Sequence, residues 1–354
     1  MEGSNMQSYA PTAAHVRLLG RSWQDADGTL WLGQSASGVE FSCTAAQVSL
    51  TLAGDQAARP DNAGSYARFA VDVNGARVLD TLLTGAAVTI PVFSAKTETP
   101  VTIRLIKLSE AASSTMGVRC ITADAVPVPT AAKSRCIEFI GDSITCGYGV
   151  DARDETCAFS TETEDVTKSC AFLAAAALDA DWSMVAYSGY GIWSGFTEDG
   201  QRHGDALVPP YYEKVAVSKD NPAAAAQPWD FSRIRPALVV LNLGTNDTSY
   251  CGTDPARQAA FTAAYVAFLR TVRARNPEAY ILCTLGLMKQ TMYACVEAAV
   301  ARHRAGTGDA RISAFQMPLQ DAADGYGADW HPSAVSQQKA AAVLTAQIRR
   351  VMAW

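Results

Sequence analysis

The chain has 354 residues, of which 49% are hydrophobic and 18% are charged. This composition is typical of a globular protein that is large enough for two domains. The formal net charge is -6, and Lys and Arg form no cluster along the chain, which excludes a basic groove for nucleic acid. Nucleic acid is therefore not an expected partner.

The chain shows no segment for membrane insertion or export. Its longest apolar runs, such as Ala171 to Leu178, are far shorter than the roughly 20 residues that cross a bilayer. Met1 to Gly20 lacks the basic cluster, apolar core and cleavage site of a secretory signal. We expect no membrane partner and a cytoplasmic location. Met1-Glu2-Gly3-Ser4 could instead be a replaced start or a vector remnant, and a protein that had lost its signal sequence would be secreted.

The nine cysteines form no Cys-x-x-Cys pair. An odd number without metal-ligand spacing indicates free thiols in a reducing compartment. Cys146 and Cys251 lie beside the motifs described below, and we interpret both as small buried hydrophobic residues in preference to thiol nucleophiles. The four histidines include no His-x-x-x-His pair, so we predict no metal site and no cofactor.

Residues 16–126 have the pattern of short antiparallel strands separated by Gly, Asn and Asp. Four runs in which side-chain character alternates are 30–32, 39–43, 48–52 and 101–105. Another run, 69–73, leads directly into Asn74-Gly75, the dipeptide preferred in two-residue hairpin turns. These features predict a β-sandwich of the jelly-roll type.

A junction follows at 126–133, where prolines favour extended backbone and cannot join a central strand. We place the domain boundary near residue 130, which gives a β-sandwich domain over 1–130 and a second domain over 131–354. The second domain alternates predicted strands with Ala-rich helices, a pattern that indicates a parallel sheet with helices on both faces. The strands are predicted at 135–141, 184–187, 237–243 and 280–285, and the helices at 167–179, 255–275, 290–305 and 333–352.

A long insertion at 197–232 interrupts this alternation. It is rich in Pro and aromatic residues, so we expect an irregular but ordered loop. Loops of this length in compact domains are usually functional or mobile. Two interpretations remain open, a wall of a substrate site and a loop that packs over the sheet.

The first strand of the second domain ends in Gly141-Asp142-Ser143. Glycine allows a sharp turn where a buried strand ends, and such a turn would present Ser143 at the carboxyl edge of the sheet. Ligands bind at that edge in open α/β sheets, so Ser143 is a candidate nucleophile. The alternative is that Asp142 and Ser143 only cap the following helix.

Serine needs a neighbouring base to accept its proton. His331 lies in Asp329-Trp330-His331-Pro332, directly before the last predicted helix, and this loop should reach the same sheet edge as the serine. We therefore predict His331 as the general base and Asp329 as the residue that orients its imidazole. The other three histidines, His15, His203 and His303, are expected to be solvated surface residues.

Acyl transfer also requires donors for the developing oxyanion. A predicted strand ends in Gly244-Thr245-Asn246-Asp247, where the Asn246 amide could point into the site. Another strand runs into Ser188-Gly189-Tyr190, where the Gly189 N–H can approach a substrate closely. The Ser143 N–H would be a third donor.

These blocks resemble those of the GDSL, or SGNH, hydrolases. Ser143, Gly189, Asn246 and His331 match, in order, the four residues that give the SGNH family its name. The resemblance implies Ser143 as nucleophile, His331 as base, and an oxyanion hole formed by Ser143, Gly189 and Asn246. The family usually places its acid three residues before the histidine, where this chain has Ala328. The third catalytic member is therefore either Asp329 or a backbone carbonyl that supports a Ser–His dyad.

The leading β-sandwich, Gly-Asp-Ser-Ile-Thr-Cys-Gly-Tyr-Gly and Asp-Trp-His-Pro together resemble family two of the carbohydrate esterases. That resemblance covers nearly the whole chain and implies removal of O-acetyl groups from xylan, mannan or related oligosaccharides, with transacetylation known in the family. The candidate substrate contacts are Asp142, Tyr190, Trp193 and Trp330. Tyr211, Tyr212 and Trp229 are further aromatic residues near the site in chain order, and each such ring could equally be part of a core.

The predicted function is that of a serine carbohydrate O-acetylesterase acting on an acetylated oligosaccharide or polysaccharide. Two rivals remain open: a lipase or thioesterase that acts on another acyl ester, and an inert carbohydrate-binding protein in which the β-sandwich does the binding. The sequence does not determine the oligomeric state.

Overall fold

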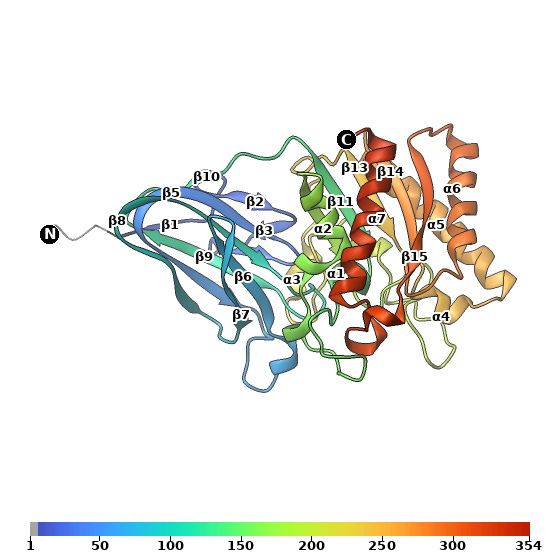
Figure 1. Ribbon diagram of the computed structural model, residues 1–354, viewed down its shortest axis with the longest axis horizontal. Helices are drawn as coiled ribbons and strands as arrows, with labels where there is room; N and C mark the ends of the chain where they lie inside the picture. Colours follow the sequence, from blue (N-terminus) through green and yellow to red (C-terminus); the bar gives the residue numbers. More distant parts are fainter. Residues whose placement is uncertain (1–5) are drawn as a thin grey trace. The chain divides into compact units, whose positions relative to one another are not determined.

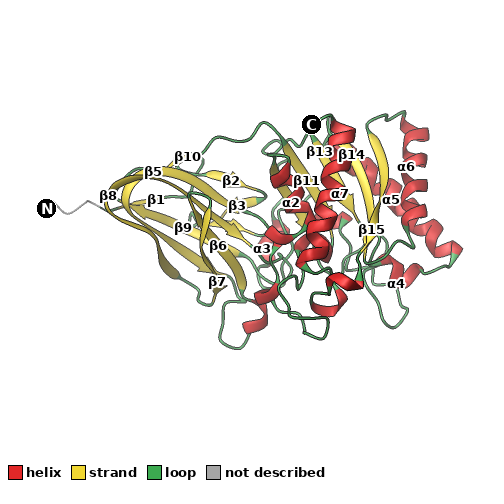
Figure 2. Ribbon diagram, in the orientation of Figure 1, coloured by secondary structure: helices red, strands yellow, loops and turns green. Residues whose placement is uncertain are grey.

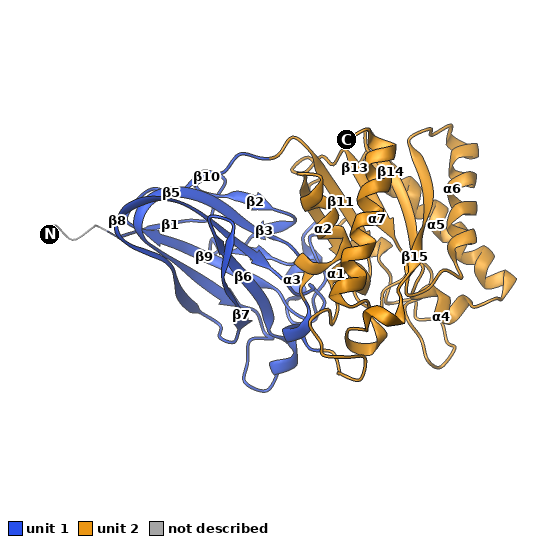
Figure 3. Ribbon diagram, in the orientation of Figure 1, with its two compact units in different colours: residues 1–132, 160–164, 214–228 blue, residues 133–159, 165–213, 229–354 orange. Residues whose placement is uncertain are grey.

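The computed structural model describes residues 6–354, so the interpretation of Met1-Glu2-Gly3-Ser4 lies outside the described residues. The chain divides into two compact units (Figure 3). Unit 1 contains the residues up to 132 together with Ser160–Glu164 and Lys214–Pro228, and unit 2 contains Lys133–Phe159, Asp165–Glu213 and Trp229–Trp354. The long insertion is therefore shared between the units.

Unit 1 is built from antiparallel strands (Figure 1). Its strands are β1 (Gln7–Tyr9), β2 (Arg17–Leu19), β3 (Ser22–Gln24), β4 (Leu30–Leu32), β5 (Gly38–Gly54), β6 (Ala67–Val73), β7 (Ala76–Leu83), β8 (Val88–Lys107), β9 (Met116–Ala123) and β10 (Val128–Pro129). The main path of hydrogen-bonded strands runs β3-β4-β9-β5-β8-β6-β7, and β1 joins β9 while β2 and β10 join β5.

The long strands β5 and β8 pair along most of their length, and the register shifts twice, between Ala45 and Gln47 and between Val48 and Ser49. Such bulges bend a strand and increase its twist. The first half of β5 also pairs with β2 and β10, and the second half pairs with β9. The runs predicted separately at 39–43 and 48–52 are therefore the two halves of one long strand.

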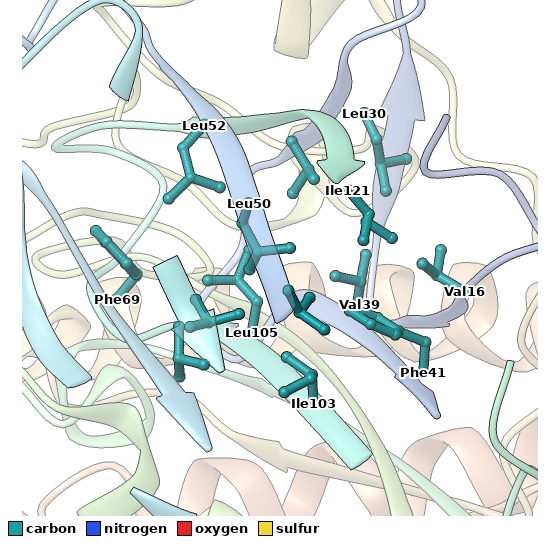
Figure 4. Close-up of a cluster of buried hydrophobic side chains, with 14 of the residues drawn as sticks. Val16, Leu30, Val39, Phe41, Leu50, Leu52, Phe69, Ile103, Leu105 and Ile121 are labelled. Atoms are coloured by element: carbon teal, nitrogen blue, oxygen red, sulfur yellow. The ribbon is translucent and has the colours of Figure 1, made fainter. Parts of the chain in front are cut away.

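The interior of unit 1 is a continuous apolar cluster (Figure 4). Phe41, Leu50 and Leu105 are fully buried within it. These side chains come from strands far apart in sequence, so their burial stabilises the long-range pairing of β5 with β8. The predicted hairpin is present between β6 and β7, and Asn74 and Gly75 both have positive φ, 52° and 82°, as the tight turn requires.

Unit 2 contains a five-stranded parallel sheet with helices on it (Figure 2). Its strands are β11 (Cys136–Gly141), β12 (Asp181–Ala186), β13 (Leu238–Asn242), β14 (Tyr280–Leu287) and β15 (Ile312–Leu319), in the order β12-β11-β13-β14-β15. The prediction of the first four is confirmed to within a few residues, whereas β15 was not predicted. It is an edge strand in which only two of the eight residues are buried, so it lacks the continuous apolar run of its neighbours.

The helices are α1 (Ser143–Cys146), α2 (Cys170–Ala177), α3 (Pro222–Ala226), α4 (Asp247–Cys251), α5 (Pro255–Arg275), α6 (Tyr293–Thr307) and α7 (Ala334–Met352). Short 3-10 turns lie at Ala63–Ser65, Thr161–Thr163, Val166–Lys168, Pro209–Tyr211, Ala322–Asp324 and Ala328–Trp330. The four predicted helices correspond to α2, α5, α6 and α7. None of the helices among residues 6–354 combines the length and apolar character needed to span a membrane.

The strand order positions the site. From β11 the chain moves to β12 on one side, and from β13 it moves to β14 and β15 on the other. Right-handed crossovers then place α2 on one face of the sheet and α5 and α6 on the opposite face. α7 packs against α2, and α5 packs against α6. The order reverses between β11 and β13, and their carboxyl ends border the crevice where ligands bind in such sheets.

Candidate active site

Ser143 follows β11 at the start of α1, and the side chain of Asp142 caps that helix by accepting a hydrogen bond from the Ile144 N–H at 3.1 Å. The turn is so tight that a side chain at Gly141 would overlap Thr145, and glycine is therefore required there. Gly147 ends α1 in the left-handed conformation, with φ at 76°. Asp142 therefore caps α1, as one interpretation held, and Ser143 follows the carboxyl end of β11, as the other expected.

The structure brings Ser143 and His331 together. Ser143 Oγ lies 2.8 Å from His331 Nε2, the distance of a hydrogen bond that a nucleophile and its base would share. On the other side of the ring, Nδ1 lies 3.1 Å from the carbonyl oxygen of Ala328 and 3.2 Å from that of Asp329. A proton on Nδ1 can therefore be donated to these carbonyl oxygens, which leaves Nε2 as an acceptor.

The carboxylate of Asp329 does not orient His331 in this structure. It accepts a hydrogen bond from the Tyr148 hydroxyl at 2.7 Å. The two alternatives for the third catalytic member were Asp329 and a backbone carbonyl. The structure places backbone carbonyl oxygens, and not a carboxylate, at His331 Nδ1. Asp329 was placed beside His331 by chain proximity, but its own backbone conformation, with φ at 50°, directs the carbonyl oxygen, and not the side chain, to the ring nitrogen.

Burial lowers the pKa of His331 below its usual range, and the two carbonyl hydrogen bonds and the charge of Asp329 only partly oppose this effect. Desolvation disfavours the charged imidazolium, so the ring is mostly neutral at pH 7. A neutral imidazole with its proton on Nδ1 is the form that can accept a proton from serine.

The loop that carries His331 holds an unusual backbone. Asp329 and Trp330 both have positive φ, 50° and 63°, which costs free energy in non-glycine residues and persists only where neighbours fix the conformation. The Trp330 carbonyl oxygen accepts a hydrogen bond from Gln320 at 2.9 Å, and the Ala328 N–H donates to the Gly149 carbonyl at 3.1 Å. These contacts fix the loop against the segment that follows Ser143.

The predicted oxyanion donors come from the neighbouring strand ends. Gly189 follows β12 with φ at 79°, and a side chain there would meet no other atom within 4 Å. Glycine is therefore favoured at this position by the positive φ and not by lack of space. Asn246 follows β13, and its amide donates one hydrogen bond to the Tyr190 carbonyl at 2.8 Å. The second amide hydrogen remains for another acceptor. Ser143, Gly189 and Asn246 line one cavity.

Asp247 was not predicted as a site residue. Its carboxylate is buried and accepts hydrogen bonds from the N–H groups of Ile192, Trp193 and Ser194, at distances between 2.7 and 3.2 Å. Burial raises the pKa of Asp247 to about 6, although these three N–H groups act in the opposite direction. The carboxylate fixes the turn that follows Gly189. Its position directly after Asn246 was the available signal in the sequence.

The cavity has a volume of about 800 Å³, within the usual range for small-molecule sites. Its lining residues are Ser143, Tyr148, Ser188, Gly189, Phe196, Glu198, Thr245, Asn246, Thr248, Ser249, Met288, Lys289, Asp329, Trp330 and His331. Phe196 and Trp330 are 50% and 58% exposed, so their rings are accessible to a ligand. Phe196 lies directly before the long insertion and Glu198 lies within it, so the start of this segment contributes to the cavity lining. Residues 199–232 are not among the lining residues.

Of the predicted substrate contacts, only Trp330 lines this cavity. Asp142 is fully buried beneath Ser143 and acts as the helix cap, so it has no surface to offer a substrate. Tyr190 packs against Tyr187, and the Arg202 guanidinium lies 3.8 Å from the centre of the Trp193 ring. These two aromatic residues stabilise the loop after Gly189, whereas chain order alone had placed them at the substrate.

Two further aromatic candidates are core residues. Tyr212 is fully buried and donates a hydrogen bond to Glu138, and Trp229 is 5% exposed. The expectation that His303 is a solvated surface residue is also wrong. It is 2% exposed and lies 3.3 Å from Asp309, because α6 turns this side chain toward the neighbouring loop. Within residues 6–354, no group of three or more His, Cys, Asp or Glu side chains is arranged to hold a metal ion.

Known proteins resemble this chain in sequence. The sequence model of the GDSL-like lipase/acylhydrolase family matches residues 139–339. The cellulase/esterase CelE of Acetivibrio thermocellus is 34% identical over 224 residues, which cover 62% of this chain but only 26% of CelE. An acetylxylan esterase/glucomannan deacetylase of Cellvibrio japonicus is 25% identical over 363 residues, covering 99% of this chain and 93% of that protein.

Solved structures show the same two-part fold. A family two carbohydrate esterase from Clostridium thermocellum, solved in complex with cellohexaose, has a TM-score of 0.82 and 28% identity, with 96% of this chain and 99% of that chain covered. An acetyl xylan esterase from Butyrivibrio proteoclasticus has a TM-score of 0.88 and covers 99% of each chain at 23% identity. The predicted fold class, a jelly-roll sandwich followed by a three-layer α/β hydrolase domain, is thereby confirmed.

The predicted family resemblance is also confirmed. The matched segment spans more than half of the chain and runs from β11 through the first part of α7, including the four residues that line up with the family's name. The chain therefore belongs to the GDSL-like lipase/acylhydrolase family.

Proposed function

We propose that this protein is a serine esterase that removes O-acetyl groups from plant-type glycans such as xylan or mannan. The observation that carries the proposal is the 2.8 Å contact between Ser143 Oγ and His331 Nε2, two residues that line a cavity of about 800 Å³. The names of the relatives supply the substrate class, since they include acetylxylan esterases and a glucomannan deacetylase.

In the proposed reaction, His331 Nε2 accepts the hydroxyl proton as Ser143 Oγ attacks the acetyl carbonyl carbon. The tetrahedral intermediate then collapses, the bond to the sugar oxygen breaks, and the imidazolium returns its proton to that oxygen. Water attacks the acetyl-enzyme with His331 again as base, and acetate leaves. A sugar hydroxyl that replaced this water would give transacetylation by the same steps.

The oxyanion of each tetrahedral intermediate would be stabilised by the N–H groups of Ser143 and Gly189 and by the Asn246 amide. Donors that are fixed before the reaction need no reorganisation as charge develops. Asn246 is held by its hydrogen bond to the Tyr190 carbonyl, and the turn after Gly189 is held by the buried Asp247 carboxylate. This rigidity is what oxyanion stabilisation requires.

A sugar substrate is consistent with the walls of the cavity. The accessible rings of Phe196 and Trp330 offer flat apolar surfaces, and Thr248, Ser249 and Glu198 supply polar groups around them. A binding site that combines aromatic faces with a few polar groups suits a ligand with both apolar and hydroxyl surfaces.

The test is acetate release from acetylated xylo- and manno-oligosaccharides, with NMR of the acetyl positions that remain. We expect Ser143→Ala to lower kcat by at least about 1000-fold, since removing the nucleophile leaves only the contributions of binding and the oxyanion hole. Ser232→Ala, at an exposed serine outside the cavity lining, is the matched control and should retain activity. Full activity of Ser143→Ala would refute the proposal, and activity on aryl acetates alone would refute the glycan substrate.

A further inference from the structure

Tyr148 contacts both the His331 ring and the Asp329 carboxylate. It lies in the segment between Ser143 and the close approach at Gly149, and the Tyr148 N–H donates a hydrogen bond to the Ser143 carbonyl oxygen at 3.1 Å. Its backbone is therefore tied to the proposed nucleophile while its side chain reaches the proposed base.

The ring of Tyr148 stacks on the imidazole. The two ring centroids are 4.0 Å apart, with an angle of 29° between the planes. Tyr148 itself stacks on Phe159, with 4.3 Å between the ring centroids and 18° between the ring planes. The imidazole thus lies against a pair of stacked aromatic rings, which restricts its rotation about the bond to Cβ. An aromatic face also stabilises the imidazolium that forms when the base takes a proton.

The hydroxyl of Tyr148 acts at a different point. It donates to Asp329 Oδ2 at 2.7 Å, while the imidazole Nδ1 faces the carbonyl oxygens of Ala328 and Asp329. A carboxylate at Nδ1 would favour the imidazolium far more than two neutral carbonyl groups do. The hydroxyl thus holds the only carboxylate on this loop segment, Ala328–Trp330, away from the position of a third catalytic member.

We propose that Tyr148 is a positioning residue for His331: its ring fixes the imidazole plane, and its hydroxyl retains the Asp329 carboxylate so that backbone carbonyls complete a Ser–His dyad. This inference rests on the proposed esterase mechanism. According to this proposal, Tyr148 determines whether the site is a Ser–His dyad or a triad with Asp329. The sequence around His331 is compatible with both.

Other groups also bear on the titration of His331. Ser143 and Tyr148 touch the ring, Asp329 belongs to the same loop, and Glu198 and Lys289 lie on other walls of the cavity. Glu198 and Lys289 carry opposite charges and stay unchanged in the variants proposed below. A difference between those variants therefore reports on the contact between Tyr148 and Asp329.

The experiment compares the pH dependence of kcat/KM for wild type, Tyr148→Phe, Asp329→Asn and the double variant, with 4-nitrophenyl acetate as substrate. Phenylalanine retains the stacked ring and removes only the hydroxyl. We expect the acidic limb of Tyr148→Phe to move to higher pH by about one unit, because the released carboxylate raises the pKa of the base. Asp329→Asn and the double variant should show no such move. An unchanged limb in Tyr148→Phe would overturn the assignment of the hydroxyl.

Tyr148→Leu tests the ring. We expect kcat to fall about tenfold relative to Tyr148→Phe with KM little changed, because the imidazole is then free to leave its productive orientation. Equal kcat in the two variants would overturn the role of the stack. NMR titration of the His331 ring nitrogens in Ser143→Ala and in Ser143→Ala/Tyr148→Phe needs no turnover. It therefore tests the hydroxyl even if the esterase proposal itself fails.

Discussion

The interior of the sandwich in unit 1 and the carboxyl edge of the sheet in unit 2 are both buried, but they bury different groups. The cluster around Leu50 and Phe41 consists of fully buried apolar side chains. At the carboxyl edge, the buried groups include the carboxylates of Asp142 and Asp247. Burial in the first region stabilises the fold, whereas burial of carboxyl groups in the second costs stability that only their hydrogen bonds offset.

This contrast shows how the molecule separates stability from chemistry. The buried carboxylates of the second region fix the turns that carry Ser143 and Gly189, and precise turns are needed for catalysis rather than for folding. Substitutions in the sandwich interior should therefore change the free energy of unfolding with little effect on kcat. Substitutions at the carboxyl edge should show the opposite ratio.

The largest expected effect is that of Leu50→Ala in the sandwich interior. Removing a fully buried Leu side chain loses its transfer free energy and leaves a cavity, which together cost about 2–5 kcal/mol. We expect this loss in the free energy of unfolding, measured by urea denaturation, and an unchanged kcat for the folded protein. A variant that kept its stability but lost kcat would contradict the separation of the two regions.

Asn246→Ala at the carboxyl edge should behave in the opposite way. Loss of one oxyanion donor lowers kcat by about 100- to 1000-fold, or about 2.7–4 kcal/mol in the barrier. The free energy of unfolding should change by less than the barrier does. The backbone carbonyl of residue 246, which accepts a hydrogen bond from the Ser249 hydroxyl at 2.7 Å, is retained in alanine.

Asn246→Asp is the matched variant, since it has nearly the same shape but replaces the amide donors with an acceptor. Its kcat should be at least as low as that of Asn246→Ala. If the aspartate variant were instead as active as wild type, neither an oxyanion donor at Asn246 nor its hydrogen bond to the Tyr190 carbonyl would be needed for activity.

The sequence predicted the strand ends of unit 2 well, because buried parallel strands are continuous apolar runs and the small residues after them mark the turns. Ser143, Gly189 and Asn246 could therefore be assigned to one sheet edge without a structure, whereas His331 was assigned to it by its position directly before the last helix. The edge strand β15 could not be predicted, since its half-exposed residues give no such run. Exposed helices and strands are in general harder to predict from sequence, because their side chains need not be apolar.

The direction of individual side chains was beyond the sequence. Asp329 and Trp330 adopt left-handed backbone conformations that nothing in their residue types requires, and this geometry decides which oxygen faces His331. Tyr148 was overlooked because its contact with Asp329 joins residues 181 positions apart. Aromatic residues near the motifs could not be sorted into core and cavity, since Trp229 and Trp330 differ only in what packs on them.

Asp142 provides the finest test of the comparison, because its effect appears only as a change in the pH dependence of stability. Burial raises its pKa from 3.8 to about 7, and the nearby charge of Asp247 acts in the same direction. Between these pH values the folded protein binds a proton that the unfolded chain has released. The stabilising contribution of this group is therefore complete below about pH 4 and is lost as the pH rises through about 7.

Asp142→Asn should remove this contribution to the pH dependence while keeping the helix cap, since asparagine caps helices as well as aspartate does. We expect the fall in the free energy of unfolding between pH 4 and pH 7 to be smaller than in wild type by roughly 3 kcal/mol, since each unit of pKa difference corresponds to about 1.4 kcal/mol. Urea denaturation across that pH range measures it. Part of the fall should remain, because the pKa of Asp247 is also raised, to about 6. An identical pH dependence in both proteins would mean that Asp142 is already ionised in the folded state, and the cap would then be a buried charge stabilised by the N–H groups of α1.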